Sequence, residues 1–267
     1  MKKTNSFCVC PLVSGSKGNS VFVSTPKTAV LIDAGLSGIE IERRLTLVGQ
    51  TPEQLSAIII THEHTDHVRG AGVLSRRFNI PVYITPKTLD ACTGLGKIQH
   101  LNFFECGTPF DIDELRVVPF SISHDAQDPA GLTLSFGENK IGIATDLGIV
   151  TGLVREHLKN CHLIYIESNH DPEMLINGPY PWSLKQRIKS RTGHLSNMDT
   201  RELLSDILGQ NPDPDVIPDL KHVILAHLSE ENNCPRKAAM EVAKGLNGSG
   251  IALYVAGPDY PGEMIRL

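Results

Sequence analysis

Residues 57–67 read AIIITHEHTDH, an apolar run that passes without a break into a dense cluster of histidine and acidic side chains. The run AIII is typical of a strand that is buried on both faces. Four side chains that can bind metals follow it: His62, His64, Asp66 and His67. In an extended segment, His62 and His64 point to the same side because they are two residues apart. Asp66 and His67 fall at the turn into the next helix and face a second point, so the spacing favours two adjacent metal ions.

The chemistry of this cluster narrows the choice of ion. Imidazole and carboxylate ligands suit Zn²⁺ and also Mn²⁺ or Fe²⁺, and the lack of cysteine at 61–67 removes any thiolate preference for zinc. The alternative is a solvated polar loop, which requires three histidines to follow a buried strand by chance within residues 62–67. We therefore interpret this segment as part of a metal site.

The rest of the chain predicts sheets covered by helices. Short runs rich in β-branched residues, separated by turns, are typical of strands. They cover residues 6–13, 20–24, 28–35, 57–61, 80–85, 114–123, 131–137, 140–146, 162–168, 222–227 and 251–257. Helical patterns cover residues 38–48, 68–78, 87–93, 150–159, 171–176, 182–189, 197–208 and 234–246. This order favours an α+β fold with helices on the outer faces. No repeat, linker or charge block divides the chain, so we expect a single domain over 1–267.

The composition is that of an ordinary protein with a packed core. The chain has 267 residues, of which 40% are hydrophobic, and 25 Lys and Arg against 30 Asp and Glu give a net charge of −5. This balance argues against a broad basic surface for nucleic acid, although it allows a local patch. No apolar run reaches the roughly 18 residues of a membrane span, so we expect no membrane partner. The six cysteines form no C-x-x-C pair, which favours reduced thiols and a cytoplasmic location.

The sequence HEHTDH at 62–67 resembles the H-x-H-x-D-H motif of the metallo-β-lactamase superfamily. The resemblance implies a four-layer αββα sandwich, with two mixed sheets flanked by helices and a site for two divalent ions at one edge of the sheets. It also implies three further ligands, each at the end of a predicted strand: His124, Asp146 and His227. In the family pattern, one ion is bound by His62, His64 and His124. The other is bound by Asp66, His67 and His227, and Asp146 bridges the two.

Two later motifs favour cleavage of phosphodiesters. TGHLSN (192–197) and AHLSEEN (226–232) resemble segments of the transfer-RNA 3′-processing nucleases. This resemblance implies that His194 assists at the scissile phosphate beside the metals and that Glu167 orients it. We expect the two ions to activate a water for in-line attack on phosphorus, and His194 to protonate the departing oxygen. The metal ligand Asp66 is counted with His194 and Glu167 among the catalytic residues.

Motifs along the chain are similar to the YycJ/WalJ-like branch of the superfamily, also called VicX-like. They are SGSKGNS (14–20), VLIDAGLS (30–37), ESNHD (167–171), GPYPWSLKQRIKS (178–190) and GHLSN (193–197). The resemblance implies a nuclease, with 5′-to-3′ exonuclease activity on double-stranded DNA as the leading assignment. One alternative is a small-molecule hydrolase of a thioester, lactone or cyclic phosphodiester, which would use the same metals in a different groove. A non-catalytic metal-binding regulator is disfavoured because all seven ligands and His194 are present.

Three segments are candidates for binding the substrate. The Gly/Ser loop at 14–20 offers Ser14, Ser16 and Asn19, which could hold a terminal phosphate together with free backbone N–H groups. The loop could equally be a plain hairpin connection. Residues 182–191 carry four cations and no acid: Lys185, Arg187, Lys189 and Arg191. We interpret them as a surface for the nucleic-acid backbone, the alternative being a solvated helix face. His170 stays open between a phosphate contact and a buried structural histidine, and the sequence leaves the native metal and the oligomeric state open.

Overall fold

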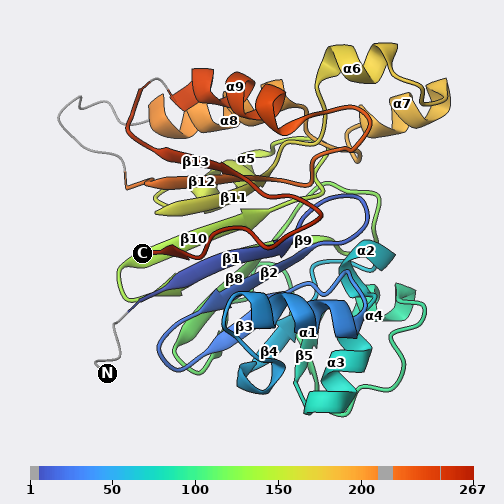
Figure 1. Ribbon diagram of the computed structural model, residues 1–267, viewed down its shortest axis with the longest axis vertical. Helices are drawn as coiled ribbons and strands as arrows, with labels where there is room; N and C mark the ends of the chain where they lie inside the picture. Colours follow the sequence, from blue (N-terminus) through green and yellow to red (C-terminus); the bar gives the residue numbers. More distant parts are fainter. Residues whose placement is uncertain (1–5, 210–218, 247) are drawn as a thin grey trace.

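A computed structural model describes residues 6–209, 219–246 and 248–267 of the chain. Two seven-stranded sheets lie face to face in the middle, and helices cover their outer faces (Figure 1). The predicted four-layer αββα fold is therefore confirmed. Most strands end within two residues of the predicted positions. The strand predicted at 28–35 is an exception and ends at Ile32, where Asp33 takes a left-handed backbone conformation with φ 62°.

The first sheet has the order β14-β1-β2-β3-β4-β5-β6. Its strands are β1 (Cys8–Val13), β2 (Ser20–Ser24), β3 (Ala29–Ile32), β4 (Ala57–Ile59), β5 (Val82–Ile84), β6 (Leu101–Phe103) and β14 (Ile265–Arg266). Strands β3 to β6 run parallel, whereas β14, β1, β2 and β3 pair antiparallel. The segments between its strands form α1 (Gly38–Leu47), η1 (Pro52–Gln54), α2 (Thr65–Val68), α3 (Ala71–Phe78) and α4 (Pro86–Ala91).

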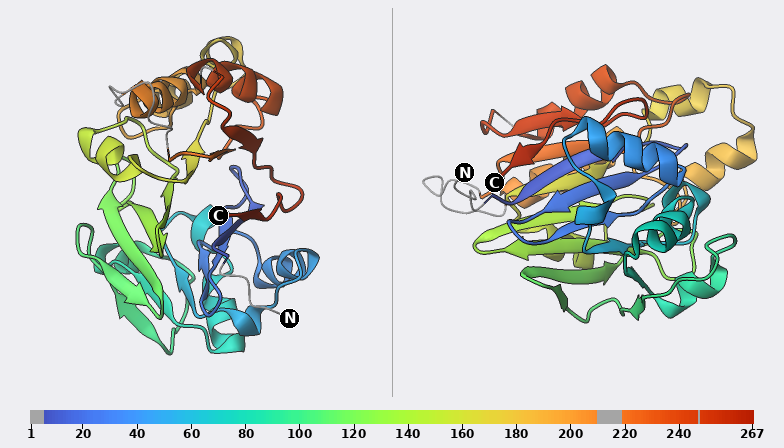
Figure 2. Two further views of the ribbon diagram at one scale, coloured as in Figure 1. Left: turned by 90° about the vertical axis from the view of Figure 1, so that its left-hand side faces the viewer. Right: turned by 60° about the horizontal axis from the view of Figure 1, so that its bottom comes forward.

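The second sheet has the order β13-β12-β11-β10-β9-β8-β7. Its strands are β7 (Phe110–Ile112), β8 (Leu115–Ser121), β9 (Ala130–Phe136), β10 (Asn139–Ala144), β11 (Leu163–Glu167), β12 (His222–Ala226) and β13 (Ala252–Val255). Helices α5 (Gly152–Leu158), α8 (Asn197–Gly209) and α9 (Pro235–Leu246) cover its outer face. Two short helices, α6 (Pro172–Asn177) and α7 (Trp182–Ile188), project beyond the sheets at one end (Figure 2).

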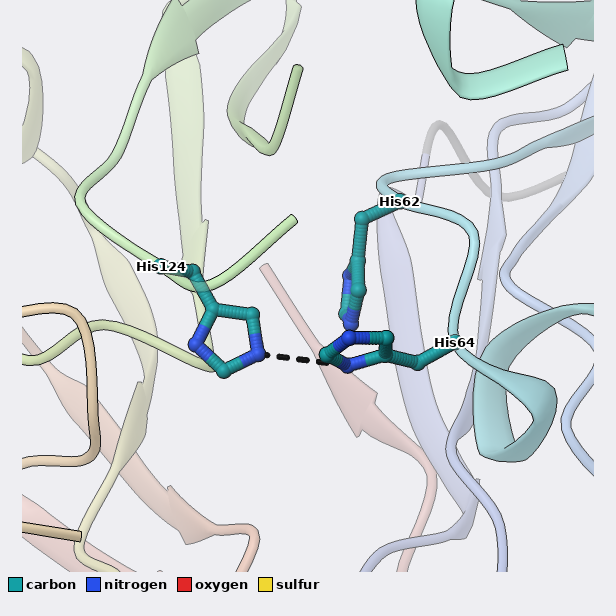
Figure 3. A group of neighbouring side chains, drawn as sticks. All are labelled: His62, His64 and His124. Carbon is teal, nitrogen blue, oxygen red and sulfur yellow. Dashed lines mark hydrogen bonds between the residues drawn. The ribbon is translucent and has the colours of Figure 1, made fainter. Parts of the chain in front are cut away.

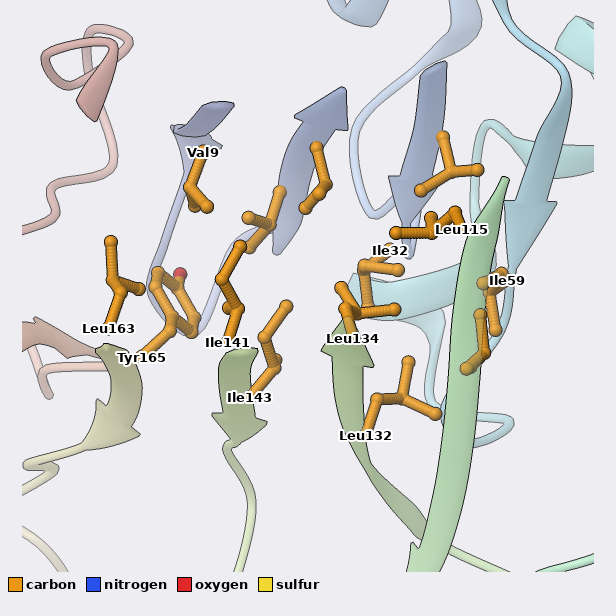
Figure 4. Packing of buried hydrophobic residues seen from close by; sticks show 14 of the residues in the cluster. Val9, Ile32, Ile59, Leu115, Leu132, Leu134, Ile141, Ile143, Leu163 and Tyr165 are labelled. Carbon is orange, nitrogen blue, oxygen red and sulfur yellow. The ribbon is translucent and has the colours of Figure 1, made fainter. Parts of the chain in front are cut away.

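The core explains why so many strands are continuously apolar. In β4, Ala57 and Ile59 point into the space between the sheets, where side chains of both sheets interlock (Figure 4). Ile58 points the other way and packs in one cluster with Ile41 of α1 and Leu74 of α3. Because successive side chains of a strand face opposite sides, a strand in the middle of four layers needs apolar residues at every position.

Several elements escape the sequence patterns. Strands β6, β7 and β14 are two or three residues long and partly exposed, so they lack the apolar run that marks the equally short β4 and β5. The helix predicted at 68–78 begins only at Ala71 as α3, after the separate short helix α2. In the ranges that the structure describes, no helix is both long and apolar enough to cross a membrane.

Candidate metal centre and cleft

Strand ends from both sheets converge at one edge of the sandwich. The loop 60–64 follows β4 of the first sheet, while three ends come from the second sheet, those of β8, β10 and β12. The loop 60–64 carries His62 and His64, and α2 directly after it carries Asp66 and His67, while each of the three strand ends carries one further candidate ligand. The structure brings all seven together in overlapping groups whose ligand atoms lie within 4.8 Å of one another: His62, His64, Asp66, His67, His124, Asp146 and His227.

The first group consists of three histidines (Figure 3). The ring centroids of His62 and His64 are 4.7 Å apart, and the ring of His124 lies 5.2 Å from that of His62 and 5.0 Å from that of His64. His64 Nδ1 approaches His124 Nε2 to 3.3 Å. His62 and His64 come from the loop after β4, and His124 comes from the second sheet, so this group joins the two sheets.

The second group contains Asp66, His67 and His227, and Asp146 lies between both groups. The carboxylate oxygens of Asp146 are 3.3 Å from His67 Nε2 and 3.3 Å from His227 Nδ1. Asp146 is also 3.9 Å from His124 Nε2. This position between the two groups is the one that a bridging carboxylate requires.

Unpartnered atoms show that these residues fit metal ions. Among the described residues, His62 Nε2, Asp146 Oδ2 and His227 Nε2 are buried without any hydrogen-bond partner. Buried polar atoms are almost always hydrogen-bonded, so three unpartnered atoms in one centre indicate that a ligand binds there. The donor atoms are all nitrogen and oxygen, which suits divalent ions such as Zn²⁺ and Mn²⁺.

The charges of the centre also favour cations. Burial opposes ionisation of Asp146, but His227 and His67 hold its pKa well below the usual value, so the carboxylate is charged. Burial lowers the pKa of His62 far below the ordinary histidine value and also lowers that of His124. The neighbouring carboxylates outweigh burial at His67 and His227, where they raise the pKa, at His227 to about 10, so these two imidazoles must give up a proton when a metal binds.

Asp33 is a functional residue that the sequence analysis missed. Its Oδ2 accepts a hydrogen bond from His67 Nδ1 at 2.7 Å and another from the Thr61 hydroxyl at 2.8 Å. A carboxylate on the second nitrogen fixes the tautomer and orientation of a histidine ligand. The available signal was an aspartate directly after a buried strand, the same pattern that marks Asp146.

Glu167 holds two histidines at once. Its Oε1 accepts hydrogen bonds from His194 Nδ1 at 2.8 Å and from His227 Nδ1 at 2.7 Å. Its Oε2 accepts the backbone N–H groups of Leu147 and Leu195 at 3.0 and 3.1 Å. Burial opposes its charge, yet the neighbouring histidines and their hydrogen bonds lower the pKa of Glu167 to about 2. The sequence predicts the contact with His194, and the structure adds the one with His227.

His194 lies at the border between this centre and solvent. Its side chain is 20% exposed, and it lines an open cleft of about 270 Å³ together with His64, Asp66, His124, Asp146 and His227. Burial lowers the pKa of His194, but the charge and hydrogen bond of Glu167 outweigh burial and raise the pKa above the usual value. Because Nδ1 is held by Glu167, Nε2 is the ring atom left for a substrate.

The candidate substrate residues divide into two sets. Ser16 and Arg187 line the cleft, and the Arg187 Nε donates to Asp125 Oδ2 at 2.7 Å. Ser14 and Asn19 are buried and contact metal-centre residues instead. Ser14 Oγ accepts the backbone N–H of His227 at 2.7 Å, and Asn19 Nδ2 donates to Asp66 Oδ2 at 3.1 Å. These contacts position residues of the metal centre, and a role of Ser14 and Asn19 in binding phosphate stays a prediction.

The four cations of the predicted basic surface lie in different surroundings, and their binding of nucleic acid stays a prediction. Lys185 is only 9% exposed, and its Nζ donates to the backbone oxygens of Ile176 and Gly178 at 2.7 and 2.8 Å. Lys189 and Arg191 follow α7 and are outside the residues that line the cleft. His170 is 4% exposed and also outside that lining, and burial lowers its pKa to about 4, as for a structural histidine.

Gly35 packs against the metal-binding loop so closely that only glycine fits. A Cβ at Gly35 would lie 1.6 Å from the backbone oxygen of Asp66. We expect Gly35→Ala to displace this loop, to destabilise the fold by about 1–3 kcal/mol and to weaken metal binding about 10- to 100-fold. Thermal unfolding and a metal titration measure both effects. Gly152→Ala is the matched control, because nothing lies within 4 Å of the added Cβ. Unchanged stability and metal affinity in Gly35→Ala would contradict this packing.

Known proteins share this fold and much of this sequence. The profile of the Metallo-beta-lactamase superfamily matches residues 13–218. Exodeoxyribonuclease YycJ of Bacillus anthracis is 36% identical over 245 residues, 91% of this chain and 90% of that protein. Exodeoxyribonuclease WalJ of Streptococcus pneumoniae is 38% identical over 249 residues, again 91% of this chain and 90% of that protein.

A solved structure agrees in fold along the whole chain. The metallo-beta-lactamase fold protein YhfI from Bacillus subtilis superposes with a TM-score of 0.73 and 15% identity, covering 99% of this chain and 100% of that one. At this identity the likeness concerns the fold alone. With the family profile and the two relatives, it leads to one assignment. The chain belongs to the metallo-beta-lactamase superfamily.

Proposed function

We propose that the protein is a two-metal phosphodiesterase that degrades double-stranded DNA as a 5′-to-3′ exonuclease. The observation that carries the proposal is His194, which Glu167 holds in the same cleft as the seven candidate metal ligands. The relatives that match most of the chain are named exodeoxyribonucleases, which supports DNA as the substrate.

The residues of the cleft have different roles in the proposed cleavage of a phosphodiester. Two divalent ions, Zn²⁺ or Mn²⁺, would be held by the seven ligands and would supply an activated water and positive charge on the phosphate. His194, whose pKa is raised, keeps a proton on Nε2 for the departing oxygen. Glu167 positions His194 and His227, and Asp66 serves as a ligand. Among the described residues that line the cleft, Arg187 is the only Lys or Arg, so binding depends chiefly on the metals.

We further propose that residues 1–267 act as a single domain and that the protein works in the cytoplasm. The two sheets share one interior cluster of buried side chains, which joins the two halves of the chain. The six cysteines are free thiols, as expected of a reducing compartment.

Linear duplex DNA tests the proposal. The metal-loaded protein is incubated with duplexes that carry a 5′-phosphate or a 5′-hydroxyl and a label at one end, in Mn²⁺ and in Zn²⁺. We expect stepwise release of nucleotides from the 5′ end, and none from His64→Ala. A metal-loaded protein that cleaves neither DNA nor RNA but hydrolyses a thioester would instead support the small-molecule hydrolase.

A further inference from the structure

The segment 171–189, which we call the arm, brings apolar side chains into the lining of the cleft. It contains α6 and α7, which project beyond the sheets at the end where the metal-binding loops lie (Figures 1 and 2). Tyr180 and Leu184 line the cleft together with His194. Trp182, the only tryptophan of the chain, lies between these two residues in the sequence, and its side chain is 65% exposed. Tyr180 and Leu184 are each half-buried, and the apolar surface that they leave open in the cleft is available for a ligand to cover.

The arm holds these side chains on a fixed support. Tyr180 lies between Pro179 and Pro181, whose rings restrict the backbone on both sides. The Lys185 ammonium donates to the backbone oxygens of Ile176 and Gly178, which ties α7 to the end of α6. This cation, which the sequence assigns to phosphate, therefore braces the arm.

The arm is also anchored to the body of the protein. Leu175 of α6 is wholly buried and Ile188 of α7 is 8% exposed. Arg187 Nε donates to Asp125 Oδ2 at 2.7 Å, which links α7 to the loop that carries His124. A braced and anchored aromatic residue loses little conformational entropy when a ligand stacks on it.

The charges of the cleft indicate what this ligand is. Acidic groups and metal ligands form one part of the lining, and the only Lys or Arg among the described lining residues, Arg187, is already paired with Asp125. Further phosphates of a DNA strand find no unpaired Lys or Arg there. Stacking of a base on an aromatic ring needs no charge and accepts any base, because every base has a π-face.

We propose that Tyr180, flanked by Leu184, is a stacking surface for the nucleobase next to the scissile phosphate. The inference rests on the proposed function and deepens it, because it names the part of the substrate, a base at the cleaved end, that the arm binds.

A cycle of enzyme and substrate changes tests the contact. The metal-loaded protein, Tyr180→Ala and Tyr180→Phe are compared on DNA whose nucleotides at the cleaved end are normal or abasic. On normal DNA we expect Tyr180→Ala to lower kcat/KM about 5- to 150-fold, the equivalent of about 1–3 kcal/mol for one stacked base. Tyr180→Phe keeps most of the activity. On DNA with abasic ends, we expect the kcat/KM of the wild type to fall by the same factor, and Tyr180→Ala to lower it no further.

Binding gives a second readout that is independent of turnover. The fluorescence of Trp182 is followed while a single-stranded oligonucleotide with phosphorothioate linkages is titrated into the metal-loaded protein. We expect normal DNA to change the fluorescence and to bind more tightly than the abasic strand, and Tyr180→Ala to remove this difference. Ile176→Ala is the matched control, because this side chain is 50% exposed on the same arm but outside the cleft lining.

Two kinds of failure can be told apart. If the wild type degrades no DNA, the proposed function fails. If the wild type degrades DNA but Tyr180→Ala slows the cleavage of normal and abasic substrates by the same factor, the stacking surface is wrong and the nuclease assignment stands. The same conclusion follows if Tyr180→Ala slows the cleavage of neither substrate.

Discussion

Asp146→Asn is expected to lose bound metal and to lower the rate of DNA cleavage by more than about 10³-fold, since metal charge on the phosphate contributes several kcal/mol. The carboxylate lies 3.3 Å from both His67 Nε2 and His227 Nδ1, and its Oδ2 has no other partner in the described chain. Asparagine tolerates the left-handed backbone at this position, φ 60°, so the substitution removes the charge without straining the chain. Metal content per chain and initial rates measure the result.

The chain offers a matched control for this substitution. Asp113 is also left-handed, with φ 51°, and lies exposed in the turn between β7 and β8. Asp113→Asn makes the same chemical change in the same backbone conformation away from the cleft, and we expect normal metal content and rate. An Asp146→Asn protein that keeps two ions and full activity would exclude Asp146 as the bridging ligand.

His194→Ala is expected to lower the rate about 10²- to 10⁴-fold while the metal content stays at the wild-type level. The ring is held at Nδ1 by Glu167 and is partly exposed in the cleft, which suits a proton donor rather than a ligand. Rates and metal content are compared in the same preparations. Glu167→Gln separates the two roles further, because Glu167 also holds His227, and it should reduce both activity and metal affinity.

An exposed histidine away from the cleft is the control for His194. His100 lies exposed in the loop before β6, and His100→Ala should leave rate and metal content unchanged. Loss of metal from His194→Ala would make His194 a ligand, and an unchanged rate would remove it from the chemistry.

Most of the strands could be predicted from the sequence, because a buried strand is marked by apolar residues that are neighbours in the chain. In β4 and β11, apolar residues at every position predict strands buried on both faces, and the core confirms it. Strands β6 and β14 could not be predicted in this way. β14 has two residues and exists because Ile265 pairs with Val9 of β1, from the opposite end of the chain.

The basic segment shows where local information ends. Four cations at 182–191 look alike in the sequence, but the turn of α7 buries Lys185 against backbone oxygens and leaves Arg187 at the cleft. The contacts of Ser14 and Asn19 could not be predicted from neighbouring residues either. Their partners, the backbone N–H of His227 and the carboxylate of Asp66, are 213 and 47 residues away. No spacing rule reaches over such separations.

The sequence by itself indicated the candidate ligands through the motif at 62–67 and through the resemblance that adds three residues at predicted strand ends. Only the tertiary structure decided which of these groups touch. Glu167 pairs in register with Ala226, so its side chain lies beside His227, which is 60 residues later in the chain. Asp33 reaches His67 because β3 and β4 are neighbours. Hydrogen-bond partners depend on strand order and register, and these are set by the packing of the two sheets as a whole.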